Sequence, residues 1–197
     1  MREVEVKAVV TDVHALRSHL IAADAAQTFA GELIDLRYDG RDGALSAGDQ
    51  MLRLRTYLAR DGTSRSVVDW KGPTEAIGGY KVREELSTAV GDASTLHAML
   101  TQLGFVVVRE IDREIETYSL EGATVRIEHY PRLDILVEVE GEPDCIERAI
   151  ERTRMPRTVF TCERLVAFVE RFEARSGMRA ALSKRELQSM RVEGAAV

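Results

Sequence analysis

The chain has 197 residues, of which 45% are hydrophobic and 30% are charged, and its formal net charge is −6 at pH 7. This length suits one domain with a sizeable core. The acidic balance argues against broad binding to nucleic acid or anionic membranes, and no apolar run approaches the roughly 18 residues that cross a bilayer. The N-terminus has a strand pattern rather than a signal peptide. Cys145 and Cys162 lack metal-ligand spacing, so we expect ordinary thiols in a reducing cytoplasm.

The first half of the chain predicts short strands with one helix. A strand is expected over residues 2–10, a helix over 12–24 and a strand over 31–39. Three glycines between residues 40 and 50 indicate a long turn. Strands over 51–59 and 66–72 should form a hairpin around Asp61-Gly62, and a further strand covers 79–88.

The second half predicts three more helices and the last strands. A helix capped by Asp92 or Ser94 should end at Gly104 and bury Leu96, Met99, Leu100 and Leu103. Strands are expected at about 105–120, 123–129 and 134–141. A third helix should begin near Asp144, and a fourth, ending at Gly177, carries apolar residues at helical spacing: Leu165, Phe168, Val169 and Phe172. Residues 181–190 show a short helical pattern that is lost from Glu193. Roughly eight strands joined mainly by turns predict a mostly antiparallel sheet in an α+β fold.

Several predicted strands carry charges on one face and apolar residues on the other. Glu3, Glu5 and Lys7 alternate with Val4 and Val6, and the pattern returns in LRLR and VEVE. The remaining charged faces contribute Asp69, Lys71, Lys81, Arg83, Glu85, Arg113, Arg126 and Glu128. For a single strand, the ordinary explanation is one buried and one solvated face.

The repeated like charges favour a second explanation, a polar interior that holds a charged ligand. Glu3 and Glu5, Arg53 and Arg55, and Glu138 and Glu140 are like-charged pairs two residues apart, about 7 Å along a strand, where they repel one another. Paired carboxylates suit divalent cations such as Mg²⁺ or Mn²⁺, and paired arginines suit phosphate oxygens. Together they describe a site for a metal-bound polyphosphate. Amphipathic helices would then cover the outward apolar face.

These motifs resemble the CYTH, or triphosphate tunnel metalloenzyme, superfamily. Its E-x-E-x-K hallmark matches Glu3-Val4-Glu5-Val6-Lys7. In family order, LRLR supplies the R-x-R pair, DWKGP supplies Lys71, YKVREEL ends in an inward Glu85, and VRIEHYPRLDILVEVE resembles the closing strands. The resemblance covers residues 1 to about 145. It implies an eight-stranded antiparallel β-barrel, a tunnel with a charged interior, covered by amphipathic helices. We expect this domain over residues 1–177, followed by a helical or flexible tail over 178–197.

The resemblance also implies roles for the charged side chains. The metal would be bound by Glu3, Glu5, Glu128, Glu138 and Glu140. The catalytic set would be Glu3, Glu5, Lys7 and Glu85, and the triphosphate would be bound by Lys7, Arg53, Arg55, Lys71, Lys81, Arg83, Arg113 and Arg126.

Two segments depart from the family pattern. Many cyclase-like members carry K-x-R-x-x-Y before the last hairpin, whereas this chain has Ile111 in the lysine position, then Arg113, and a displaced Tyr118. Residues 133–136 read Leu-Asp-Ile-Leu instead of the usual Leu-Gly-Asp-Phe.

The activity favoured by the resemblance is that of a class IV adenylyl cyclase, which converts ATP into cyclic AMP and pyrophosphate. The EVEVK, WKGP and YKVREEL segments resemble that subgroup more than they resemble the short bacterial tripolyphosphatases. A triphosphatase acting on tripolyphosphate, thiamine triphosphate or a nucleoside triphosphate is the alternative, and a non-catalytic polyphosphate- or nucleotide-binding module is a third. The expected partner is a small-molecule triphosphate, with no nucleic acid or membrane, and a homodimer stays open.

Other residues that could carry chemistry have simpler explanations. His14, His19 and His97 fall on predicted helices, where a surface role is expected, and His129 should face away from Glu128. Trp70 and Tyr80 are expected to pack within the fold rather than stack on a base.

Overall fold

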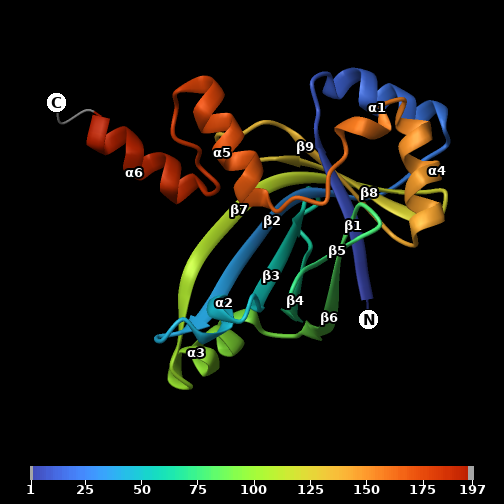
Figure 1. Ribbon diagram of the computed structural model, residues 1–197. Coiled ribbons are helices and arrows are strands. Elements are labelled where there is room, and N and C mark those ends of the chain that lie inside the picture. Colours follow the sequence, from blue (N-terminus) through green and yellow to red (C-terminus); the bar gives the residue numbers. More distant parts are fainter. Residues whose placement is uncertain (1, 195–197) are drawn as a thin grey trace.

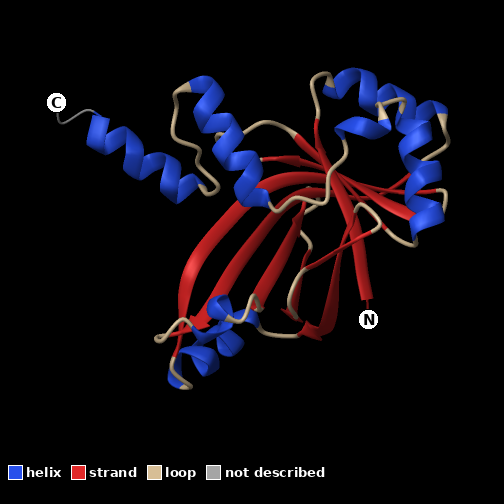
Figure 2. Ribbon diagram, viewed as in Figure 1, coloured by secondary structure: helices blue, strands red, loops and turns tan. Residues whose placement is uncertain are grey.

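The computed structural model describes residues 2–194, and its centre is a closed antiparallel β-barrel (Figures 1 and 2). Eight strands form the barrel in the order β1-β9-β8-β7-β2-β3-β4-β6, and pairing between β1 and β6 closes it. A short strand, β5, pairs with β6. The strands are β1 Arg2–Val9, β2 Ala26–Gly40, β3 Met51–Ala59, β4 Ser64–Lys71, β5 Glu75–Ile77, β6 Tyr80–Val90, β7 Phe105–Leu120, β8 Ala123–His129 and β9 Leu136–Glu140. The predicted eight-stranded antiparallel barrel is therefore confirmed, with β5 as an addition.

Strand register directs the charged faces into the barrel. Lys7 of β1 lies opposite Glu138 of β9, and Arg53 of β3 lies opposite Asp69 of β4. Because side chains alternate across a strand, these pairs share the interior face, whereas Val6 and Val139 share the outer, apolar face. All four charged side chains are buried. The alternation in the sequence thus reflects a charged interior, not a wet outer surface.

Two helices cover the outer face of β1, β8 and β9. They are α1 (Val13–Ala22) and α4 (Pro143–Thr153), which lie together at one side of the barrel (Figure 1). The Asp12 carboxylate accepts a hydrogen bond from the Ala15 amide and begins α1. Leu16 and Leu20 of α1 and Ile146 and Ile150 of α4 pack against the outward valines of the barrel strands in one apolar core.

A third helix, α3 (Ala93–Gln102), packs Leu100 against Tyr38 and Leu54 on the outside of β2 and β3. The prediction that Met99 and Leu103 are also buried is wrong: they are 56% and 73% exposed. The contact is narrow, because only one stripe of this helix reaches the sheet. Leu86 of β6 is 57% exposed, because it lies away from the three apolar clusters that the helices form.

Helix α5 (Leu165–Ser176) contacts residues from the barrel interior rather than the outer apolar face. Its Phe168 belongs to an apolar cluster with Ile111, Tyr130 and Leu136. Since Ile111 and Tyr130 also line the central cavity, α5 covers one end of the tunnel.

The tail after Gly177 returns to the barrel before its last helix. Ala181 exchanges backbone hydrogen bonds with Arg132, and Leu182 joins the apolar cluster of α5. Helix α6 (Lys184–Gly194) follows and extends away from the barrel (Figure 1). The loss of helical pattern predicted from Glu193 falls partly on residues 195–197, which lie outside the described range. Two short helices, α2 (Ala44–Ala47) and η1 (Arg157–Val159), were not predicted.

In the described part of the chain, every helix is too short or too polar to cross a membrane. Cys145 and Cys162 are free thiols.

Candidate active site

A cavity of about 490 Å³ occupies the barrel interior and is lined mainly by charged side chains. Every residue predicted for catalysis, metal binding or triphosphate binding lines it, except Glu128. The residues come from β1, β3, β4, β6, β7, β8 and β9, so barrel closure is what brings them together. Ser46, Asp49, Gln50 and the first residues of α5 complete one end.

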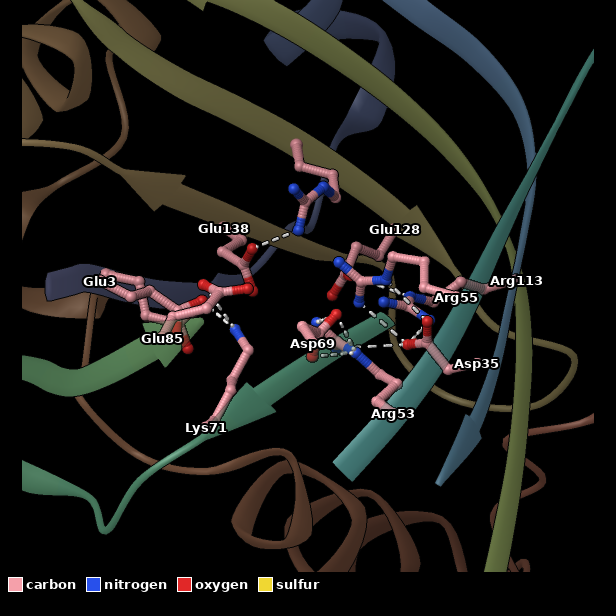
Figure 3. A network of polar contacts seen from close by, with 12 residues as sticks. Glu3, Asp35, Arg53, Arg55, Asp69, Lys71, Glu85, Arg113, Glu128 and Glu138 are labelled. Carbon is pink, nitrogen blue, oxygen red and sulfur yellow. Dashed lines mark hydrogen bonds and ion pairs between the residues drawn. The ribbon is translucent and has the colours of Figure 1, made fainter. Parts of the chain in front are cut away.

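Carboxylates gather on the side of the cavity formed by β1, β6 and β9, which we call the acidic wall (Glu3, Glu5, Glu85, Glu138 and Glu140). Figure 3 shows three of them, Glu3, Glu85 and Glu138. Glu5 and Glu140 are direct cross-strand partners, an arrangement of like charges that is unfavourable without a cation.

Lysines partly neutralise the acidic wall. The Lys71 ammonium contacts Glu3 and lies 3.3 Å from Glu85, Lys81 lies 2.5 Å from Glu5, and Lys7 lies 2.7 Å from Glu138. Arg126 donates to the other Glu138 oxygen at 2.5 Å. Each lysine therefore forms an ion pair with at least one carboxylate of the acidic wall.

Arginines dominate the opposite side, formed by β2, β3 and β7, which we call the arginine wall (Arg37, Arg53, Arg55, Arg109 and Arg113). Asp35 organises it and is fully buried. Its carboxylate accepts from Arg55 at 2.7 and 2.9 Å and from Arg113 at 3.0 Å (Figure 3). Burial alone would raise the pKa of Asp35, but the charges of Arg55, Arg53 and Arg113 hold it well below its usual range. Asp35 thus stays ionised and fixes the arginines.

Two further contacts fix the cationic side chains. Asp69 accepts from Arg53 in a forked pair at 3.0–3.1 Å. Arg83 donates instead to backbone carbonyls, at 2.7 Å to Gly72 and 2.8 Å to Asp49. These bonds limit side-chain motion and leave the cavity preorganised for an anion.

Glu128 lies beneath the cavity wall rather than in it, with 1% of its surface exposed. It accepts hydrogen bonds from Arg113 at 2.9 Å and from the Tyr130 hydroxyl at 3.0 Å, and lies 3.5 Å from the Lys7 ammonium. Burial raises the pKa of this carboxyl, but Lys7 and Arg113 outweigh burial and lower it to about 2. Glu128 therefore positions the cationic side chains of Lys7 and Arg113. Its metal ligation stays a prediction.

Charge is left unbalanced at one point on each wall. Burial and the neighbouring Glu138 raise the pKa of Glu140 to about 7. Across the cavity, burial and repulsion from Arg53 lower the pKa of Arg37 to about 10. The acidic wall therefore lacks a full positive counter-charge at Glu140, and the arginine wall lacks a full negative counter-charge at Arg37.

The donors of the acidic wall fit a divalent cation, although they are not arranged around one. Among residues 2–194, no group of three or more His, Cys, Asp or Glu side chains already has metal-binding geometry, since lysines engage Glu3, Glu5 and Glu138. One oxygen of Glu3 is nevertheless buried without a hydrogen-bond partner. With five carboxylates and the Glu5–Glu140 pairing, the wall has the all-oxygen chemistry that Mg²⁺ and Mn²⁺ prefer.

The analysis of the sequence missed Asp35, Arg37, Tyr57 and Arg109. The first two were visible in principle, because Asp35, Arg37 and Asp39 alternate with Ile34, Leu36 and Tyr38 as the charged strands do. Tyr57 continues the alternation of Arg53 and Arg55, and Arg109 has the same parity as Arg113, so strand periodicity could have placed both on the interior face.

The aromatic and histidine residues considered earlier lie elsewhere. Trp70 donates to Gln50 at 3.2 Å and Tyr80 donates to Glu147 at 2.5 Å, and neither lines the cavity. His14 and His97 are exposed, and His129 contacts Arg17 on the outer side at 3.5 Å.

A closed barrel with facing acidic and cationic walls defines a tunnel-type site for highly charged ligands. The sequence model of the CYTH domain matches residues 1–153, so the chain belongs to the CYTH family. A search among curated proteins found no match.

Solved structures share this fold at low sequence identity. A candidate adenylate cyclase from Vibrio parahaemolyticus superposes with a TM-score of 0.71 at 15% identity, covering 85% of this chain and 97% of its own. The PH1819 protein from Pyrococcus horikoshii superposes with a TM-score of 0.67 at 22% identity, covering 83% of this chain and 96% of its own. A protein from Hippeastrum is named as an adenylyl cyclase candidate with a dominant triphosphatase activity. It superposes with a TM-score of 0.60 at 17% identity, covering 92% of this chain and 99% of its own.

Proposed function

We propose that this protein is a divalent-metal-dependent enzyme that cleaves a phosphoanhydride bond of a triphosphate substrate inside the barrel. The observation that carries the proposal is the facing of the acidic wall and the arginine wall across one cavity. A metal–triphosphate complex has both charge signs and can satisfy both walls together.

The side chains divide into two tasks. Glu3, Glu5, Glu138 and Glu140 would hold Mg²⁺ or Mn²⁺, which neutralises phosphate charge and activates the attacking oxygen when bound. Arg55 and Arg113 are fixed by Asp35 and would stabilise charge that develops on the phosphoryl oxygens. The carboxylates of Glu128, Glu138 and Glu5 outweigh burial and raise the pKa of Lys7, which keeps this side chain a cation beside the substrate. Glu85 is the candidate to orient the nucleophile.

Hydrolysis is the outcome that the residues favour. Water would attack the terminal phosphorus of tripolyphosphate, the P–O bond to the diphosphate would break, and orthophosphate and pyrophosphate would leave. The support is that Trp70 and Tyr80, the aromatic residues considered for stacking on a base, contact other parts of the fold.

Cyclisation of ATP is the second candidate, because Tyr57 and Tyr130 provide aromatic rings in the cavity wall. The 3′-hydroxyl would attack the α-phosphorus and pyrophosphate would leave. The free thiols of Cys145 and Cys162 support a cytoplasmic location for either reaction.

The test is a product assay with ATP, tripolyphosphate and thiamine triphosphate, each with Mg²⁺ and with Mn²⁺. Orthophosphate release supports hydrolysis, and cyclic AMP supports cyclisation. Glu5→Gln should lower kcat/KM on the order of 100-fold, whereas Glu84→Gln, which removes an exposed carboxylate of β6, should not change it. Tight binding without any product would refute the enzyme and support a binding module.

A further inference from the structure

Three arginines form a row across the arginine wall. Arg37 of β2 lies opposite Arg109 of β7 on one side and opposite Arg53 of β3 on the other. Like charges placed directly opposite one another are unfavourable. Asp69 neutralises Arg53 through the forked pair. Across residues 2–192, no carboxylate forms an ion pair with Arg37 or Arg109. Water can solvate Arg109, which is exposed, whereas Arg37 is partly buried and its charge is left uncompensated.

Arg37 is the more constrained of the two. It lines the cavity and is partly buried, and its Nε atom is buried without a hydrogen-bond partner. An unsatisfied buried donor is costly, and more so on a charged group. Burial and repulsion from Arg53 and Arg113 lower the pKa of Arg37, and together they outweigh the attraction of Asp35, which would raise it. The side chain therefore occupies a position suited to an anion.

The acids of the same strand are already engaged. Asp35 accepts from Arg55 and Arg113. Asp39 accepts from the backbone amides of Leu45 and Ser46, both at 2.9 Å. Any further negative charge at Arg37 must therefore come from a ligand in the cavity.

The position of Arg37 along the tunnel separates it from the main cationic cluster. Asp35, Arg55 and Ile111 occupy one level of the β7–β2–β3 register, and Arg109, Arg37 and Arg53 occupy the next, about 7 Å further along the strands. Ile111, which offers no donor, packs in the cluster that contains Phe168 of α5. Asp49 lies just before β3 and pairs at 2.5 Å with Arg164, the residue that precedes α5. Because Arg37 lies opposite Arg53 near the start of β3, it lies toward the end of the tunnel that α5 covers.

We propose that Arg37, assisted by Arg109, forms a phosphate subsite beyond the triphosphate site, which selects linear polyphosphates of four or more phosphates. A guanidinium matches phosphate oxygens in a forked geometry, and an uncompensated one gains most from them. This proposal rests on the proposed function, because it extends the same ligand along the tunnel.

The test measures binding of pyrophosphate, tripolyphosphate and tetrapolyphosphate by titration calorimetry, in EDTA and with Ca²⁺. The Kd of the wild type for tetrapolyphosphate should be at least about 10-fold lower than its Kd for tripolyphosphate, because one additional charge-assisted hydrogen bond contributes a difference of that size. Arg37→Gln should abolish that gain and leave the gain from two to three phosphates intact. Arg37→Lys should keep part of it. Arg41→Gln makes the same charge change at an exposed position of the following turn and should bind like the wild type.

The outcomes separate this proposal from the proposed function. An equal loss for tripolyphosphate and tetrapolyphosphate in Arg37→Gln, or no loss, overturns the distal subsite. Failure of the wild type to bind any of the three anions in either condition overturns the triphosphate function itself. Without ligand, Arg37→Gln should melt no lower than the wild type, because it removes an uncompensated charge; a lower melting temperature would mean a structural role and overturn the subsite.

Discussion

Replacing Asp35 with asparagine should destabilise the ligand-free protein strongly. Asp35 is fully buried and accepts from Arg55 and Arg113 at 2.7–3.0 Å, with Arg53 at 3.5 Å. Removing one partner of a buried ion pair costs about 3–5 kcal/mol, because the remaining charge stays buried and uncompensated. For a chain of this size, 1 kcal/mol changes Tm by roughly 2–4 °C. We therefore expect Asp35→Asn to lower Tm by about 6–20 °C.

The same variant should respond to polyphosphate more than the wild type does. An anion that binds only the native state at 100 times its Kd stabilises by about 2.7 kcal/mol. In Asp35→Asn the anion would also neutralise arginines that have lost their carboxylate, so the increase in Tm with tripolyphosphate should exceed that of the wild type. Thermal unfolding followed by circular dichroism, with and without tripolyphosphate, measures both effects.

Asp39→Asn is the matched control for this experiment. Asp39 lies on the same strand and is equally buried, but it accepts from Leu45 and Ser46 rather than from arginine. Its substitution should lower Tm without enlarging the response to tripolyphosphate. A Tm for Asp35→Asn within about 2 °C of the wild type, or the same anion response in both variants, would refute the view that Asp35 neutralises a phosphate-binding arginine cluster.

Two further measurements test the surroundings of the cavity. The pKa of Glu128 falls from 4.5 to about 2 in the folded chain, so its stabilising contribution is complete above pH 4.5 and is lost as the pH falls toward 2. Denaturant unfolding between pH 6 and 3 should therefore show a smaller loss of unfolding free energy in Glu128→Gln than in the wild type. Identical dependence on pH in the two proteins would contradict the assignment. Phe168→Ala should reduce the free energy of unfolding by about 3–5 kcal/mol, because Phe168 is 2% exposed in the cluster with Ile111. Since α5 covers the tunnel end, the KM of the Phe168→Ala variant for polyphosphate should rise by a larger factor than its kcat falls. An unchanged KM would show that α5 does not shape the site.

Much of the barrel could be predicted because its charge pattern has the period of a strand. Glu3, Glu5 and Lys7 fall on one face, and in a closed barrel one face has to be the interior. The sequence motifs then identify which charges gather, and nearly all of them line the cavity.

The placement of partners was less accessible to prediction. Asp35 neutralises Arg113 across 78 positions of sequence, and Glu128 binds Lys7 across 121. Such pairs depend on strand order and register, which the period of one strand does not determine. The periodicity of α5 likewise identifies its apolar stripe, but not that the stripe meets the tunnel end through Ile111.

The two uncompensated groups give the strongest argument about the ligand. If the interior were only a lattice of structural ion pairs, Glu140 and Arg37 would be expected to find partners of opposite charge within the barrel. Instead, burial and like-charged neighbours shift the pKa of Glu140 upward and that of Arg37 downward, so both shifts favour the neutral form. A simple anion would relieve only the arginine wall and a simple cation only the acidic wall. A polyphosphate with a bound divalent cation relieves both at once, which is why we expect metal and polyphosphate to bind cooperatively.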